Sequence, residues 1–166
     1  MALIFKRSFY GRDFAGNLVA IKVIKPDLAQ DKSARERFLR EARTAASMRH
    51  DALVPVYGVE APPGEPAYLV MPLIDGPTLA QVIRAEGPLP AERAARIVSR
   101  LAEGLSVVHA AGIVHRDVKP GNVLLDDGRP KLTDFGLARS LAEAAITSTG
   151  AIAGTPSYLS PEQLAT

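Results

Sequence analysis

Three polar residues in the second half of the sequence have the types and spacing that phosphoryl transfer needs. Asp117 and Asn122 lie in the run HRDVKPGN, residues 115 to 122, and Asp134 follows in the triplet DFG. Moving a phosphoryl group from a nucleotide requires metal ions that neutralise phosphate charge and a carboxylate that orients the attacking hydroxyl. Carboxylate and amide oxygens are hard ligands of the kind that Mg²⁺ prefers. This part of the chain is therefore the candidate for a phosphoryl-transfer site.

A lysine in the first half of the sequence lies where an apolar strand is expected. The run LVAIKVI, residues 18 to 24, is β-branched and apolar around Lys22, which predicts a buried or half-buried strand. Between Ser33 and Met48, apolar residues recur at helical spacing among good helix formers, which predicts a helix. A cation within an apolar strand needs an anion nearby, and Glu41 on this helix can supply it. The residues leave a second interpretation open, in which Glu41 pairs with Arg37, four residues earlier on the surface of the helix.

The rest of the sequence adds further strands and then helices. Runs 53–59 and 67–74 predict the two strands of a hairpin, because the Pro- and Gly-rich turn APPGEP separates them. Thr78 is a good N-cap for a short helix, and apolar residues line one face of a longer helix over 91–111. The runs NVLLDD and RPKLTDF predict two short strands that are joined by an Asp-Gly turn.

The order of these elements predicts an α+β fold with two lobes. Residues 1–74 would form a small, mainly β lobe with one helix, and residues 75–166 would begin a mainly helical lobe. The composition changes around Asp75, where we place the hinge between the lobes. Beyond Gly136 the sequence is polar and has no sustained apolar period, which predicts a long functional loop.

The composition is that of a soluble globular chain. Of the 166 residues, 47% are hydrophobic and 23% are charged, and the absence of cysteine excludes disulfides and favours the cytoplasm. The apolar run in MALIFKRSFYGRDF is too short for a secretory signal, and no stretch of apolar residues is long enough to span a bilayer. The 20 Lys and Arg residues are scattered and nearly balanced by 18 Asp and Glu, which argues against nucleic acid as a partner.

Taken together, the motifs VAIK, HRDVKPGN and DFG resemble those of the protein kinase family, and the resemblance covers nearly the whole chain. It implies a two-lobed kinase fold with ATP as the phosphoryl donor and Mg²⁺, or Mn²⁺, as the cofactor. Asp117 would be the catalytic base, and Lys119 would offset the charge of the transferred group. Asn122 and Asp134 would bind the metal. His115 is expected to pack and hydrogen-bond beside the loop.

The resemblance also assigns the contacts of the nucleotide. Lys22 would hold the α and β phosphates, and Glu41 would orient Lys22. The run AYLVMPLIDGPTL resembles the segment whose backbone hydrogen-bonds adenine, here through the carbonyl of Pro72 and the amide of Ile74. Met71 would occupy the gatekeeper position. Ala20 and Leu124, one from each lobe, would pack against the two faces of the adenine.

Two local features resemble the serine/threonine kinases, and among these the eukaryotic-type kinases of bacteria. Lys119 follows Asp117 by two residues, and GTPSYLSPE resembles the peptide-docking segment, with Ser160 in place of the usual alanine. The implied substrate is a protein with Ser or Thr hydroxyls. The resemblance also implies that two copies of the chain can form a homodimer for autophosphorylation.

An arginine beside the catalytic aspartate implies regulation by phosphorylation. Arg116 precedes Asp117, and in the family an arginine at this place commonly binds a phosphate on the activation loop. Thr147 and Thr149 lie at the distance along the chain that this contact requires. We expect phosphorylation of either threonine to order the loop through Arg116.

The chain departs from the family pattern at both ends. The expected GxGxxG loop before SFYGRD is absent, since Gly11 and Gly16 fall too late, and the sequence ends four residues after Glu162. We therefore expect a kinase domain that is truncated at both ends. Two alternatives stay open: a catalytically silent scaffold, and a small-molecule phosphotransferase. The latter shares the Asp, Asn, Asp spacing, but VAIK, Lys119 and GTPSYLSPE count against it.

Overall fold

The computed structural model describes residues 5–24, 32–63, 65–134, 158 and 161 of the chain. Its first layer is a four-stranded antiparallel sheet with the strand order β1-β2-β4-β3. These strands are β1 (Phe5–Arg12), β2 (Leu18–Ile24), β3 (Gly58–Glu60) and β4 (Tyr68–Pro72).

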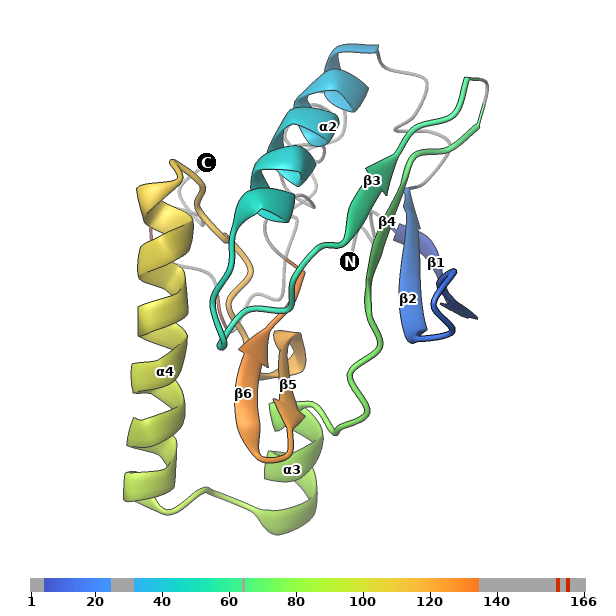
Figure 1. Cartoon of the computed structure of the whole chain (residues 1–166). Helices are drawn as coiled ribbons and strands as arrows, with labels where there is room; N and C mark the ends of the chain where they lie inside the picture. The colour runs from blue at the N-terminus through green and yellow to red at the C-terminus, as the bar shows by residue number, and fades with distance from the viewer. Residues whose placement is uncertain (1–4, 25–31, 64, 135–157, 159–160, 162–166) are drawn as a thin grey trace.

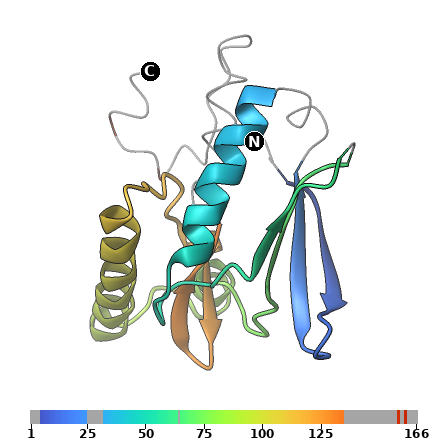
Figure 2. The same cartoon turned by 45° about the horizontal axis from the view of Figure 1, so that its top comes forward.

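Helices and a small hairpin form the rest of the described structure. In both Figure 1 and Figure 2, α2 lies between the four-stranded sheet and α4, and the β5–β6 hairpin lies below α2. Strand β6 contacts α4, and β5 contacts α3. The elements are α2 (Lys32–Ser47), α3 (Leu79–Glu86), α4 (Ala91–Ala110), the short 3₁₀ helix η1 (Pro120–Asn122), β5 (Val123–Asp126) and β6 (Arg129–Leu132).

Local sequence signals account for most of these elements. Strand β2 has the predicted bounds, and α2 and α4 each lie within one residue of theirs. Thr78 caps α3 as expected: its Oγ1 accepts the N–H of Gln81 at 3.2 Å, and its own N–H donates to Oε1 of Gln81 at 2.7 Å. Asp127 and Gly128 form the turn of the β5–β6 hairpin with φ values of 48° and 78°, the left-handed conformation that an Asp-Gly hairpin turn requires.

Residues 53–57 do not form part of the strand that was expected over 53–59. The strand that pairs with β4 covers Gly58–Glu60, and just before it the N–H of Tyr57 donates to the oxygen of Val70 at 2.8 Å. The residues before β3 run past β6 instead, where the N–H of Val54 donates to the oxygen of Leu132 at 2.9 Å, and the N–H of Leu132 donates to the oxygen of Ala52 at 2.8 Å. Leu53, Val54 and Val56 are buried because they belong to the core between the sheet and the hairpin, whereas Tyr57 is exposed.

Strand β1 was not expected from the sequence, because its mixture of basic and aromatic residues shows no alternation of apolar and polar side chains. The turn that follows it does carry a signal. The carboxylate of Asp13 accepts the N–H groups of Ala15 at 2.9 Å and of Asn17 at 2.8 Å. Hydrogen bonds, first of all that from the Asn17 side chain, lower the pKa of Asp13. This turn reverses the chain so that β1 pairs antiparallel with β2.

One continuous hydrophobic core connects the sheet, the helices and the hairpin. Phe38 of α2 and Leu132 of β6 are both fully buried, and the segment around Leu53 lies between them in the same cluster. The core therefore fixes the β5–β6 hairpin relative to α2 and the sheet. Across the described ranges, none of the helices is both long and apolar enough to cross a bilayer.

Candidate active site

The β5–β6 hairpin brings two residues that are far apart in the sequence to one place. Val123 lies opposite Leu132, so the residue before β5 and the residues after β6 are neighbours. The N–H of Thr133 donates to the backbone oxygen of Asn122 at 2.9 Å. Asn122 and Asp134 therefore lie at the same end of the hairpin.

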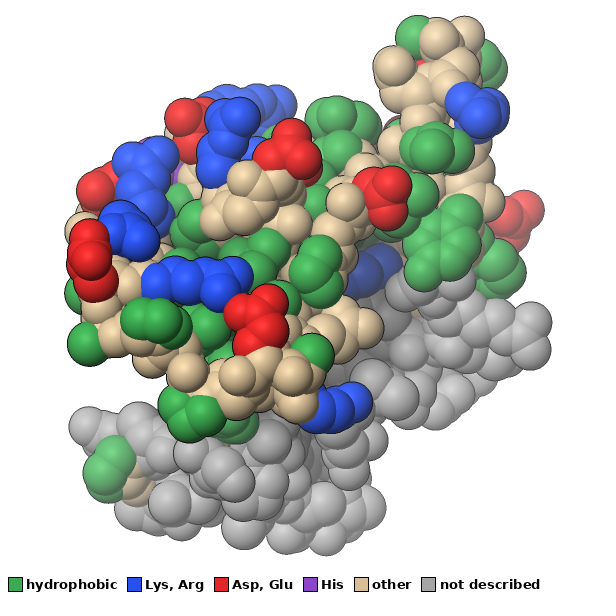
Figure 3. All heavy atoms as spheres, turned by 90° about the horizontal axis from the view of Figure 1, so that it is seen from below, with side chains coloured by type: hydrophobic (Ala, Val, Ile, Leu, Met, Phe, Trp, Pro, Cys, Tyr) green, Lys and Arg blue, Asp and Glu red, His purple; other side chains and the backbone are tan. Residues whose placement is uncertain are grey.

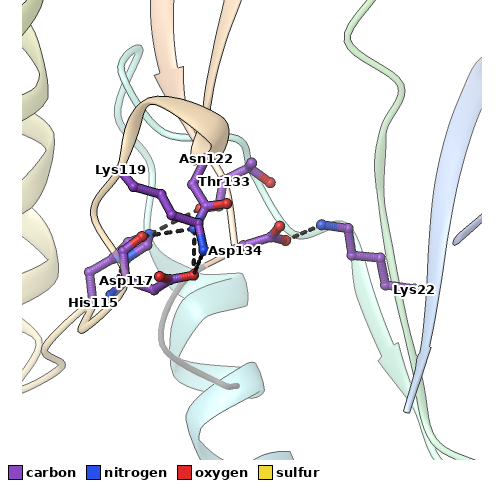
Figure 4. A network of polar contacts seen from close by, with 7 residues as sticks. All are labelled: Lys22, His115, Asp117, Lys119, Asn122, Thr133 and Asp134. Atoms are coloured by element: carbon purple, nitrogen blue, oxygen red, sulfur yellow. Dashed lines mark hydrogen bonds and ion pairs between the residues drawn. The ribbon is translucent and has the colours of Figure 1, made fainter. Parts of the chain in front are cut away.

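The carboxylate of Asp117 is held by two donors. Nζ of Lys119 lies 2.8 Å from its Oδ2, and Nδ2 of Asn122 donates to the same oxygen at 2.8 Å (Figure 4). Nδ2 of Asn122 also donates to the backbone oxygen of Asp117 at 2.8 Å. These contacts fix both the loop and the carboxylate, and they are all made by residues of the HRDVKPGN run.

An ion pair connects the four-stranded sheet to this cluster. Nζ of Lys22 contacts Oδ1 of Asp134, and the two side chains are 16% and 30% exposed. Figure 4 shows Asp134 between Lys22 and the group around Asp117. Glu41, the expected partner of Lys22, lies half-buried on α2, and its contact with Lys22 stays a prediction. The structure thus joins the lysine of VAIK to the aspartate of DFG.

The ring of His115 is buried and supports the loop that carries Asp117. Its side chain is 1% exposed, its Nε2 lies 3.0 Å from the backbone oxygen of Thr133, and the N–H of Asp117 donates to its Nδ1 at 3.3 Å. A proton on Nε2 and none on Nδ1 satisfies both contacts. Burial lowers the pKa of His115 from its ordinary value, because a charged ring would lose its hydration there. The structural role expected for His115 is confirmed.

This burial predicts that acid destabilises the protein. Below the ordinary His pKa of 6.5, His115 binds a proton in the unfolded chain but stays unprotonated in the folded chain, because its folded-state pKa is lower. The stability that is present above pH 6.5 is therefore lost as the pH falls towards the folded-state pKa. Urea denaturation at about pH 7.5 and about pH 5.5 measures the loss, which we expect to be smaller in His115→Asn. His109→Asn, at an exposed position of α4, is the control. Equal pH dependence in wild type and His115→Asn would contradict the prediction.

A cavity beside the sheet corresponds to the segment expected to contact adenine. Its volume is about 540 Å³, in the range of small-molecule sites. Of the expected adenine contacts, Ile74 lines this cavity, Met71 is buried in β4 opposite Ala20, and Leu124 is half-buried in β5. The cavity is lined by Tyr10, Leu73, Ile74, Asp75, Gly76 and Pro77.

Comparisons with known proteins agree with this arrangement. Residues 11–166 match the sequence profile of the protein kinase domain. The chain belongs to the protein kinase family. The kinase PknB of Mycobacterium tuberculosis, named a serine/threonine-protein kinase, is 43% identical over an alignment of 151 residues that covers 87% of this chain and 24% of PknB. PknL of the same organism, also named a serine/threonine-protein kinase, is 47% identical over 147 residues, 88% of this chain and 37% of PknL.

Solved kinase structures show the same fold. The crystal structure of the M. tuberculosis PknI kinase domain matches with a TM-score of 0.72 and 31% identity in its C20A mutant, over 82% of this chain and 56% of that one. The resemblance to bacterial serine/threonine kinases and the α+β kinase fold are thereby confirmed. The chain spans 24% of the length of PknB and 37% of that of PknL. The lobe boundary at residue 74 stays a prediction.

The backbone is strained at two positions of this kinase site. Arg116 and Asp134 both have φ of 62°, a left-handed conformation that favours glycine and costs other residues energy. Such strain persists only where the surrounding contacts enforce it, and here it lies on either side of the Asp117 cluster. The predicted phosphate contact of Arg116 stays a prediction, because Thr147 and Thr149 lie outside the described residues.

The residues of the kinase site fit a magnesium ion. Across the described ranges, no three His, Cys, Asp or Glu side chains cluster as a metal site. Mg²⁺ does not require such a cluster, since it commonly takes one or two carboxylates, water and substrate phosphates. The amide nitrogen of Asn122 faces Asp117, so Oδ1 is the atom of this side chain that would bind the metal together with the carboxylate of Asp134. Tyr10 also lines the 540 Å³ cavity, a place that was not expected for it because β1 was not predicted from the sequence.

Proposed function

We propose that this chain carries the catalytic site of an ATP-dependent serine/threonine protein kinase, which transfers the γ-phosphoryl group of MgATP to a Ser or Thr hydroxyl of a protein. The observation that carries the proposal is the ion pair between Lys22 and Asp134, together with the hydrogen bond from the N–H of Thr133, the residue before Asp134, to Asn122 of the Asp117 cluster. This arrangement supports the proposal, because phosphoryl transfer needs a cation for the phosphates, oxygens for the metal and a base close together.

Asp117 orients the attacking hydroxyl in this proposal. Both of its side-chain contacts use Oδ2, so the substrate hydroxyl meets Oδ1. Oδ1 accepts the hydroxyl proton as the new oxygen–phosphorus bond forms and the bond to the oxygen of ADP breaks. Lys119, with Nζ at 2.8 Å from Asp117, offsets the negative charge of the group in transfer.

The other residues position the nucleotide. Asn122 and Asp134 would hold the magnesium ion, which would neutralise phosphate charge. Lys22 exchanges its contact with Asp134 for the α and β phosphates, and Glu41 then orients it. The base lies against Ala20, Met71 and Leu124. Across the described residues, the N–H of Ile74 has no backbone acceptor, so it is available to the base.

MgATP binding tests the proposal directly. We expect MgATP to raise the melting temperature, because a ligand at 100 times its dissociation constant adds about 2.7 kcal/mol of stability. Lys22→Met should reduce this shift, and Arg43→Gln, which removes an exposed cation on α2, should not. Incorporation of labelled phosphate into a basic protein measures transfer itself. A shift that Lys22→Met leaves intact would contradict the role of Lys22.

A second candidate function, a silent kinase-fold scaffold, is favoured by one observation. Strand β1 and its turn present exposed aromatic side chains, Phe9, Tyr10 and Phe14, and the GxGxxG run of active family members is absent. Glycines normally allow backbone amides to approach the phosphates closely. The scaffold is favoured if MgATP causes no shift in the melting temperature and no phosphate is transferred.

A further inference from the structure

A second cavity, separate from the candidate active site, is rich in arginine. It has a volume of about 410 Å³ and lies between α4, the β5–β6 turn and the segment Asp51–Ala52. Three of its arginines come from α4 and one from the start of β6, and none of the proposed catalytic or nucleotide-binding residues lines it. Seen from below, basic side chains interleave with acidic ones on the side of the molecule where α4 lies (Figure 3). We name this the arginine cavity; its arginines are Arg93, Arg96, Arg100 and Arg129.

The fold explains why these arginines converge. Arg93, Arg96 and Arg100 are spaced by three and four residues, so they follow one face of α4. Ile97, 6% exposed, anchors that part of the helix in the core and forms part of the cavity wall. The tight turn at Gly128 carries Arg129 to the opposite wall. All four cations are guanidinium groups, whose planar donors match the oxygens of phosphate or carboxylate groups in pairs.

The arginines of α4 already have weak partners. Nη1 of Arg93 lies 2.8 Å from Oε2 of Glu86, and Arg96 and Arg100 pair with Glu92 and Glu103. The three arginine side chains are 38%, 65% and 47% exposed, and exposed pairs of this kind contribute little to stability. These pairs hold the guanidinium groups in place, yet a stronger anion can displace them.

Arg129 differs from the arginines of α4. Within the part of the chain that the structure describes, no carboxylate lies within ion-pair distance of it, and its side chain is exposed. One acidic residue works against anion binding: Asp51 lines the cavity, with Oδ2 at 4.0 Å from Nη2 of Arg100. Its side chain is 92% exposed and can turn towards solvent.

We propose that the arginine cavity is a docking site for a protein segment that carries a phosphorylated serine or threonine. A peptide carboxylate would only replace the carboxylates that already pair with α4, so it would gain little. A phosphate carries a charge of about −1.5 to −2 and three acceptor oxygens, so it can engage Arg129 and an arginine of α4 together. The cavity volume is sufficient for a phosphorylated side chain.

The test uses the whole chain and three labelled peptides of alanine and glycine, identical except for a central phosphothreonine, threonine or glutamate. Fluorescence anisotropy should show binding of the phosphothreonine peptide alone. Arg129→Gln and, independently, Arg96→Gln should each weaken it about tenfold, as loss of one charge-assisted contact predicts. Asp51→Asn should tighten it about two- to fivefold. Arg43→Gln is the matched control and should leave binding unchanged, with circular dichroism confirming that each variant folds.

Three outcomes would overturn the proposal. Equal affinity for the three peptides would show that the phosphate is not recognised. Displacement of the phosphopeptide by excess ADP would place it in the candidate active site instead. A labelled RNA oligonucleotide that bound better than the phosphopeptide and lost binding in Arg129→Gln would assign the cavity to nucleic acid. The proposal does not depend on phosphoryl transfer, so an inactive chain that binds the phosphopeptide would still support it.

Discussion

Replacing Asp117 with asparagine should lower the rate of phosphoryl transfer by a factor of about 10²–10⁴, the range that a positioned base contributes. The side chain keeps its shape. Its single oxygen can accept hydrogen bonds from Lys119 and Asn122, the two donors that now contact Oδ2 of Asp117. The NH₂ group would then face the substrate hydroxyl. A donor would occupy the place where an acceptor for the proton is needed.

The measurement separates catalysis from binding. Initial rates with labelled ATP and a basic protein substrate give transfer, and the MgATP-dependent rise in melting temperature gives binding, which we expect to persist in the variant. Asp126→Asn is the matched control, because Asp126 lies in β5 and pairs with Lys131 at 3.6 Å, away from the cluster. An unchanged rate would remove Asp117 from the mechanism, and loss of MgATP binding would show that its main effect is on the loop.

Elements with strong local signals could be predicted from the sequence alone. The helices α2 and α4 follow from the 3.6-residue spacing of their buried residues, and α3 follows from the Thr78 cap. The hairpin turn follows from Asp-Gly, since few other pairs accept positive φ at both positions. These signals also place Asn122 and Asp134 together, because a tight turn fixes the register of β5 and β6.

Features that depend on contacts between distant segments could not be predicted. The residues 53–57 are apolar and β-branched enough for a strand, yet Leu53 and Val54 pair with Leu132 of β6, because burial between two layers overrides local preference. The same limit applies to Lys22. Its strand and its need for an anion are visible in the sequence, but whether Glu41 or Asp134 supplies the anion depends on how α2 and the hairpin sit relative to the sheet.

The connection between the sheet and the helices explains how the site stays assembled. After β4 the chain passes close to β5, where the N–H of Leu125 donates to the oxygen of Pro77 at 2.9 Å, and Thr78 forms a bridge with Leu124. This segment also lines the 540 Å³ cavity. The segment that contacts the hairpin therefore also shapes the cavity at Ile74, one of the proposed adenine contacts, and at Gly76 this segment leaves no room for a side chain beside β5.

Gly76→Ala should destabilise the protein by about 3 kcal/mol, at the upper end of the usual effect of overpacking. A Cβ at this position would lie 2.0 Å from the backbone oxygen of Leu125 and 2.9 Å from its carbon. Backbone atoms of a paired strand cannot turn aside as a side chain can. The segment would have to move away from β5, and we expect weaker MgATP binding as a second result.

Gly104→Ala is the matched control because its obstacle is a side chain. A Cβ there would lie 2.9 Å from Cδ2 of Leu53 and 3.3 Å from Cβ of Ala52. The leucine can adjust, and alanine in a helix interior gains about 0.5–1 kcal/mol over glycine, so the net loss should be about 1 kcal/mol or less. Urea denaturation of both variants measures the difference. Equal losses would show that the approach of residue 76 to β5 is no tighter than ordinary core packing, and the proposed coupling between the hairpin and the adenine site would fail.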